Sequence, residues 1–254
     1  MDKAPQIIYE DENFIAVNKP AGLLVHPTVN SKEKTLVDWL VEKYPEIKNV
    51  GDPSAGSGQI NLRPGIVHRL DRDTSGVILI ARNQKYFEYL KKLFQNHLVQ
   101  KNYLALVFGK LKNEKGIIEK PISLKAGTTK RTVHGGKMEK EALTEYEVLK
   151  TFEFIPARRS LGAGENEKGN VKYFSLVKVS PKTGRTHQIR IHLASIGHSI
   201  VGDSLYGAKE NPLGLKRQFL HAESLEFATE EGKRMRIEAE QPKDLKSVLK
   251  NLEP

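Results

Sequence analysis

Short strand-like segments recur along the chain, while helical patterns are few. Each segment is rich in β-branched or aromatic residues and is bounded by turn-forming residues, which is typical of a β-strand. The segments cover residues 7–9, 14–17, 66–68, 77–81, 103–107, 142–150 and 171–179. The first two make a hairpin pattern over 6–18, and two more strand-like pieces and a short amphipathic end follow near the C-terminus. The pattern predicts an α+β fold with a mixed, mostly antiparallel sheet.

Three helices are expected where apolar residues recur every three or four positions. The first covers 35–44, the second begins after an N-cap at Asn83 and ends near residue 96, and the third follows a cap at Thr186. We find no internal repeat and no long linker, so we expect residues 1–254 to form a single domain.

Three stretches resemble loops. Residues 49–61 are rich in Gly, Ser, Pro and Asn, and residues 162–169 resemble a mobile hairpin tip. Residues 125–140 carry four Lys and one Arg against a single acid, with three glycines that we expect to keep the loop flexible. Such a loop could settle on a phosphate backbone or could only increase solubility, and the sequence favours neither strongly.

The charge of the chain is unevenly placed. Lys and Arg number 41 against 31 Asp and Glu, a net charge of +10. Residues 61–140 alone hold 17 basic and 6 acidic side chains. A basic patch of this kind favours a polyanionic partner such as nucleic acid, because each phosphate contact releases counterions. A solvated basic surface is an equally good explanation of the charge alone.

The composition excludes several classes of protein. The chain has no cysteine, so disulfides, zinc knuckles, thiol nucleophiles and iron–sulfur sites are excluded. No run of eighteen apolar residues could span a membrane, and no signal peptide is evident, so we expect a cytoplasmic protein. Phosphate-binding loops, the dinucleotide-binding glycine pattern and the nucleophile elbow are also absent. We therefore expect no cofactor.

The segment of greatest chemical interest is His68–Gly76, with the sequence HRLDRDTSG. It places two carboxylates among basic side chains on a turn between two apolar strands, where a side chain can be held rigidly and still reach a cleft. Flanking arginines would keep Asp71 ionised, and an ionised carboxylate can act as a nucleophile or a base. The alternative is a surface turn in which Asp73 or Thr74 caps backbone amides. No second carboxylate is paired with Asp71 as a glycosidase requires.

A second segment, Pro181–His192, places Arg185 at a strand-to-helix junction. The N-terminus of a helix favours anions, so Arg185 could meet a phosphate or the carboxylate of Asp71. Taken alone, an exposed Arg beside a capped helix explains it as well. His187 and His192 are five residues apart, which places them on different faces of a helix, so we expect no metal site.

These residues resemble the RluA-type RNA pseudouridine synthases. The segment His68–Gly76 is similar to the family's catalytic motif, His-Arg-Leu-Asp-x-x-Thr-Ser-Gly. The resemblance covers nearly the whole chain. The other matching segments are 9–11, 18–22, 101–105, 183–190, 197–198, 202–203, 206–207 and 221–222.

The resemblance implies a curved, largely antiparallel sheet with an RNA-binding cleft across its middle. It implies that uridine in RNA is isomerised to pseudouridine without cofactor or metal, after the base has been flipped out of its stack. Asp71 would be the catalytic carboxylate, as nucleophile or base. Tyr103 would stack on the flipped base and serve a later proton transfer, and Arg185 would pair with Asp71.

Further site residues are expected around these three. The RNA contacts that we predict come from His68, Arg69, Arg72, Lys130, Arg131, Lys137, His187 and Arg190. Ile200 or Val201 would form the apolar wall of the pocket for the base.

The resemblance leaves the substrate open. Many relatives carry an N-terminal RNA-binding domain of the S4 type, and we expect this chain to lack one and to act as a monomer. Large-subunit ribosomal RNA and transfer RNA are both possible substrates, the former being favoured. The main rival hypothesis is a binding or ribosome-assembly protein that keeps the fold without the activity, although such a protein would not need Asp71, Tyr103 and Arg185 together. A carbohydrate hydrolase using Asp71 would lack its second carboxylate.

Overall fold

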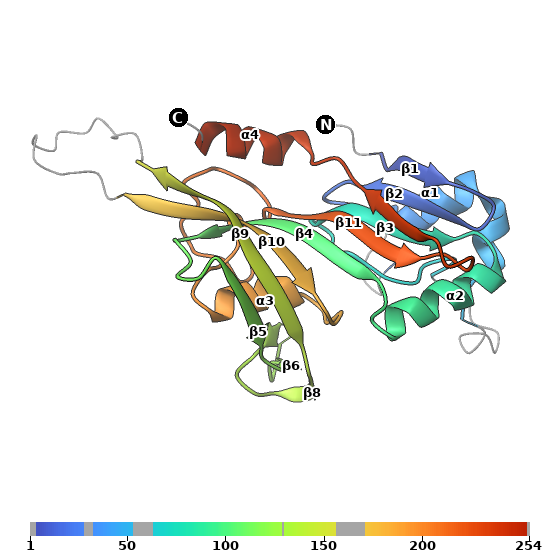
Figure 1. Ribbon diagram of the computed structural model, residues 1–254, viewed down its shortest axis with the longest axis horizontal. Coiled ribbons are helices and arrows are strands. Elements are labelled where there is room, and N and C mark those ends of the chain that lie inside the picture. The colour runs from blue at the N-terminus through green and yellow to red at the C-terminus, as the bar shows by residue number, and fades with distance from the viewer. Residues whose placement is uncertain (1–3, 28–32, 53–62, 129, 156–170, 253–254) are drawn as a thin grey trace, which may run out of the picture. The chain divides into compact units, whose positions relative to one another are not determined.

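The computed structural model describes residues 4–27, 33–52, 63–128, 130–155 and 171–252. The architecture is α+β, with largely antiparallel strand pairing and, among these residues, four α-helices (Figure 1). The predicted fold class is therefore confirmed. The chain divides into two compact units, of which unit 1 comprises Met1–Asn102 with His221–Pro242, and unit 2 comprises Tyr103–Leu220 with Lys243–Pro254.

The sheet of unit 1 begins with the predicted hairpin. Strands β1 (Gln6–Glu10) and β2 (Phe14–Lys19) pair antiparallel, and the Asp11 carboxylate turns the chain between them by accepting the amides of Asn13 and Phe14, both at 2.8 Å. Three further strands complete this sheet: β3 (Ser75–Ala81), β11 (Leu220–Ala228) and β12 (Arg234–Glu238). The order is β1-β2-β3-β11, with β12 on β11, and the β3–β11 pair is parallel.

Two helices of unit 1 start where the sequence predicts. Helix α1 (Leu36–Lys43) follows a capping box of Thr35 and Asp38. Helix α2 (Gln84–Gln95) is capped by Asn83, whose side chain accepts the amide of Tyr86 at 2.8 Å. A 3₁₀ turn, η1 (Pro45–Asn49), follows α1. The apolar faces of α1 and η1 pack on β2 and β3, and this packing fixes the sheet that carries the Asp71 turn at the start of β3.

The main strands of unit 2 pair antiparallel. They are β4 (Gln100–Phe108), β10 (Lys172–Pro181), β9 (Leu143–Phe154) and β5 (Lys115–Glu119), in the order β4-β10-β9-β5. Helices α3 (Gln188–Ser195) and α4 (Lys243–Leu252) bury their apolar residues in the core of this unit. The predicted strands at 103–107, 142–150 and 171–179 and the amphipathic end are confirmed.

The predicted loop at 125–140 is only partly a loop. Strands β7 (Arg131–Thr132) and β8 (Lys137–Lys140) lie on either side of β6 (Ile122–Leu124) in a separate three-stranded sheet. We call these three strands the basic sheet. The prediction of a freely flexible loop was wrong because cross-strand backbone hydrogen bonds order these short segments.

Other boundaries also differ from those predicted. Residues 66–68 form no strand, because only Ile66 makes an isolated bridge, to Ile80. Thr186 does not cap α3. The residue before the helix is His187, in the left-handed conformation with φ of 57° and without a side-chain cap. The tip at 162–169 and most of the loop at 49–61 lie outside the described residues.

Candidate active site

The turn that carries Asp71 is held through backbone groups. The Asp71 carbonyl accepts the amide of Thr74 at 3.2 Å. The carbonyl of Arg72 accepts the Gly22 amide and the Lys19 ammonium, each at 2.9 Å. Leu70 on the other side of Asp71 is buried in unit 1. The position of the Asp71 backbone is thus fixed from both sides, at the entrance to β3.

Lys19 is a site residue whose role the sequence analysis missed. Its side chain has no exposed surface, and its ammonium donates to the carbonyls of Pro20 at 2.8 Å, Leu23 at 2.9 Å and Arg72 at 2.9 Å. An ammonium has three donors, and burying it without partners is costly, so these bonds are required by its position. The only signal in the sequence was the Lys-Pro-Ala-Gly turn, whose lysine gives no indication of burial.

The end of the catalytic motif has a structural role. The Ser75 hydroxyl lies 3.0 Å from Nδ1 of His221, and Nε2 of His221 lies 3.0 Å from the carbonyl of Ala239. Gly76 has φ of 122°, and a Cβ atom there would lie 2.1 Å from the carbonyl oxygen of Ala222. Only glycine allows β3 and β11 to approach so closely.

The three basic residues around Asp71 differ in their contacts. Nε2 of His68 accepts the amide of Leu79 at 2.9 Å, and its ring stacks on Phe94 with centroids 4.3 Å apart. Burial, and secondly the charge of Lys101, lower the pKa of His68 to about 3, so its ring is neutral. His68 therefore brings no positive charge to RNA, and its contacts support the turn instead.

Arg69 and Arg72 are exposed. Nη1 of Arg69 lies 3.2 Å from Nε2 of His26. Arg72 pairs with Glu33 at 2.9 Å, and its Nε donates to the carbonyl of Gly22 at 3.2 Å. An exposed pair of this kind contributes little to stability, so Arg72 can exchange its partner for a phosphate at small cost.

In unit 2, Arg185 lies in a turn that is organised by one buried side chain. Oε1 of Gln188 accepts the Arg185 amide at 2.9 Å and the Thr183 hydroxyl at 2.7 Å. Its Nε2 donates to the carbonyl of Leu143 at 3.0 Å. Nε of Arg185 donates to the carbonyl of Glu141, also at 3.0 Å. The side chain of Gln188 thus holds the Arg185 turn, whereas no side chain caps the start of α3.

Two predicted RNA ligands on α3 have partners within unit 2. Arg190 is buried, and its guanidinium binds both carboxylate oxygens of Asp203 at 2.6 and 2.9 Å. Burial raises the pKa of Asp203, but the hydrogen bonds and charge of Arg190 outweigh it and hold that pKa below its usual value. The expected contact of Arg190 with RNA is therefore corrected to a buried ion pair. Nδ1 of His187 lies 3.0 Å from the hydroxyl of Tyr206.

The remaining predicted residues fall into two groups. Ile200 and Val201 are buried in the apolar core of unit 2, where Ile200 bridges to Val107. Their role as a pocket wall stays a prediction. The basic residues Lys130, Arg131 and Lys137 belong to the basic sheet or the turn before it, and the two lysines are exposed. Tyr103 lies half-buried in β4, opposite Val179 of β10. Of the three expected catalytic residues, Asp71 belongs to unit 1, and Tyr103 and Arg185 belong to unit 2.

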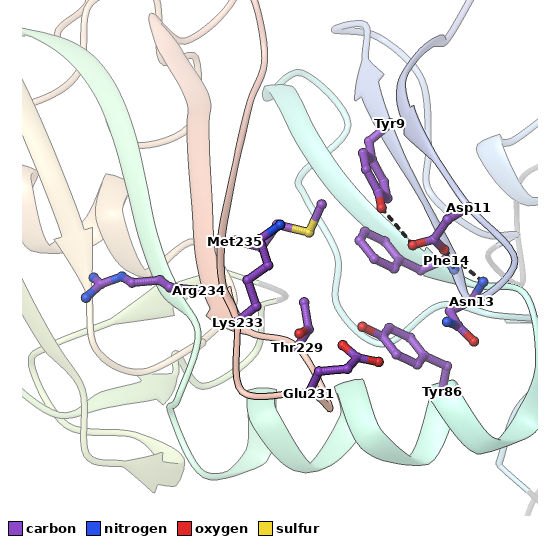
Figure 2. Close-up of a pocket in the computed structure, with 10 residues that line it drawn as sticks. All are labelled: Tyr9, Asp11, Asn13, Phe14, Tyr86, Thr229, Glu231, Lys233, Arg234 and Met235. Atoms are coloured by element: carbon purple, nitrogen blue, oxygen red, sulfur yellow. Dashed lines mark hydrogen bonds between the residues drawn. The ribbon is translucent and has the colours of Figure 1, made fainter.

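A separate hollow lies in unit 1, between the β1–β2 turn, α2 and the β11–β12 turn (Figure 2). Its volume is about 230 Å³, and none of the predicted catalytic, RNA-binding or pocket-wall residues lines it. Asp11 and Glu231 line it together with Lys233 and Arg234, so neither sign of charge dominates. Within the described ranges, no helix is long and apolar enough to cross a bilayer, and no three His, Asp or Glu side chains are grouped as metal ligands.

Comparison with known proteins gives matches to one family. The model of the RNA pseudouridylate synthase family matches residues 13–195. An RNA pseudouridine synthase of Aquifex aeolicus is 38% identical over 97% of this chain and 72% of the relative. The ribosomal large subunit pseudouridine synthase D of Borreliella burgdorferi is 34% identical over 96% of this chain and 68% of the relative. The human RNA pseudouridylate synthase domain containing 1 has the same fold, with a TM-score of 0.72, 24% identity, and coverage of 97% of this chain and 88% of that structure.

The fold and these matches define an isomerase that acts on RNA. The chain belongs to the RNA pseudouridine synthase family, and the resemblance to its RluA-type members is confirmed.

Proposed function

We propose that this synthase isomerises specific uridines of large-subunit ribosomal RNA, with Asp71 as the catalytic carboxylate. The observation that carries the proposal is the Asp71 turn. Its backbone is fixed by Lys19, Gly22 and Thr74, and these bonds use carbonyl groups and not the carboxylate. These bonds fix where the backbone of Asp71 lies, and a catalytic side chain requires such a rigid support.

The reaction proposed for this site is balanced without a cofactor. The bond between N1 and C1′ breaks, the uracil turns, and C5 bonds to C1′, while C5 loses a proton and N1 gains one. Asp71 would assist either by attacking the sugar or by removing a sugar proton. The hydroxyl of Tyr103 would serve the proton transfer at the base, and Arg185 would hold the carboxylate ionised. The target base must leave its stack before it can turn.

The choice of ribosomal RNA rests on the relatives. Those from Borreliella burgdorferi and Zymomonas mobilis are both named ribosomal large subunit pseudouridine synthase D. Transfer RNA is the alternative substrate. The exposed lysines of the basic sheet supply phosphate contacts in either case.

The test is to map pseudouridines by chemical adduct and reverse-transcription stops in cells with and without the gene. Sites in large-subunit ribosomal RNA should disappear with the gene and return with the wild type, but not with Asp71→Asn. Loss confined to transfer RNA would contradict the substrate. An unchanged map would favour the rival hypothesis of an assembly protein that keeps the fold without the activity.

A further inference from the structure

The basic sheet packs on the rest of unit 2 through a small apolar cluster. Strand β8 is exposed at all four of its positions. The apolar cluster beneath the sheet consists of Ile122, Ala142 and Ile191, with Val133 and Tyr206 packed against it. Apolar packing is not directional, so a hydrogen bond to β7 adds an orientation that this cluster does not supply.

The hydroxyl of Tyr206 supplies such a bond. It accepts the backbone amide of Arg131, in β7, at 3.1 Å, and it lies 3.0 Å from Nδ1 of His187. A phenol can accept one hydrogen bond and donate another, so one oxygen can serve both partners. The ring itself is held firmly. The Arg190 guanidinium lies 5.2 Å from its centroid, and the Asp203 carboxylate accepts the Tyr206 amide at 3.0 Å.

The other partner of this hydroxyl belongs to the Arg185 turn. His187 adopts the left-handed conformation, which is unfavourable for a residue with a side chain and requires support from its surroundings. It lies two residues after Arg185 and directly before α3. A bond to its ring therefore helps to hold the turn in which Arg185 lies.

A second connection runs between the same two regions. Nε of Arg185 donates to the carbonyl of Glu141, the residue directly after β8. The basic sheet thus contacts the Arg185 turn at both of its outer strands, through Tyr206 at β7 and through Glu141 at the end of β8.

We propose that Tyr206 is a positioning residue that couples the basic sheet to the Arg185 turn. RNA phosphates bound by the sheet fix β7, and the Tyr206 hydroxyl passes that constraint to His187 and so to Arg185. The inference rests on the proposed function, because it makes the sheet an RNA contact and Arg185 part of the active site.

The test is Tyr206→Phe, which removes the hydroxyl and keeps the ring. The matched control is Tyr173→Phe, on β10 of the same unit, where the side chain is 42% exposed. In Tyr206→Phe the Arg131 amide should exchange hydrogen about 2- to 10-fold faster, the range for loss of one ordinary hydrogen bond. RNA should bind more weakly by a similar factor, and the single-turnover rate at saturating RNA should fall. The control should match the wild type in all three.

The coupling also has a readout that does not depend on catalysis. RNA binding should slow exchange of the Arg185 amide in the wild type and slow it less in Tyr206→Phe. Equal protection of that amide in both proteins, or an unchanged Arg131 amide, would overturn the coupling. A wild type that binds RNA without forming pseudouridine would defeat the proposed function and leave this measurement intact. If Tyr206→Phe does not fold, His187→Asn breaks the same connection with a residue that tolerates the left-handed conformation. It should reduce protection at Arg185 and leave the Arg131 amide of the free protein unchanged.

Discussion

The Asp71 turn and the Arg185 turn are held by different means. A buried ammonium fixes the first through backbone carbonyls, and this binding does not depend on which side chains follow. Side chains fix the second, chiefly Gln188, and they connect it to an exposed sheet. The difference indicates a rigid support for the carboxylate and an adjustable one for the arginine that we propose to pair with it.

The largest effect on turnover is expected at Asp71, where the role of the side chain can be measured separately from the stability of the turn. Asp71→Asn should abolish turnover and leave the fold intact, because an amide is neither nucleophile nor base. Asp73→Asn, the matched control, should lose at most a turn contact of about 1 kcal/mol. Single-turnover assays on unmodified RNA, with circular dichroism for the fold, would measure both. An essential Asp73 beside a dispensable Asp71 would reverse the assignment.

Substitutions at Tyr103 test the role of a predicted catalytic side chain of unit 2 in the same way. Tyr103→Phe should keep RNA binding and impair turnover, since the ring can still stack but the hydroxyl is lost. Tyr103→Ala should also weaken binding by roughly 1–3 kcal/mol, the contribution of stacking on one base. Filter binding and single-turnover rates distinguish the two variants. A Phe variant as active as the wild type would remove the hydroxyl from the mechanism.

Substitution of Lys19 tests whether its ammonium holds the Asp71 turn. Lys19→Met should lower the free energy of unfolding by about 3 kcal/mol, because three hydrogen bonds from one buried ammonium are lost. Arg72→Met, in the same turn, removes only an exposed ion pair and should cost under about 1 kcal/mol. Urea unfolding curves measure both. Equal losses would mean that the ammonium does not hold the turn.

The smallest effect on turnover is expected at the basic sheet. Neutralising Lys130, Arg131 and Lys137 together should remove about three phosphate contacts and lower the slope of log affinity against log salt by roughly two to three units. Turnover at saturating RNA should fall only slightly, and less than in Tyr206→Phe, because the Tyr206 bond to the Arg131 backbone is intact and still supports the Arg185 turn. Titrations at several salt concentrations check the slope, and an unchanged slope would remove the sheet from RNA binding.

Purified protein should also form pseudouridine in EDTA without added nucleotide, since the reaction is an isomerisation. The readout is the pseudouridine content of unmodified RNA after incubation. Activity that is lost in chelator while the RNA stays folded would contradict the expectation.

Local patterns predicted the elements that depend on local interactions. The hairpin, α1 and α2 follow from alternation, periodicity and the side chains of Thr35 and Asn83. The errors arose where contacts between residues far apart in the sequence determine the position of a side chain. Arg190 was expected at RNA because nothing in the sequence reveals that Asp203 binds it inside the core. Lys19 is buried only because the chain folds three carbonyls around its ammonium, one of them from residue 72.

The motif predicts that Asp71 is the catalytic carboxylate. The matches to known proteins establish the family, and this role stays a prediction. The basic sheet could not be predicted because its strands are short and lack a two-residue apolar period.

The close approach of Gly76 to Ala222 affects when the chain can fold during its synthesis. The Ser75–His221 contact beside it joins residues 146 positions apart, so β3 cannot acquire its parallel neighbour until most of the chain has left the ribosome. Unit 2 likewise takes its last helix, α4, from the C-terminal end. Contacts of such sequence separation form slowly. Unit 1 therefore cannot finish folding before β12 has been synthesised, and unit 2 cannot finish before α4 has been.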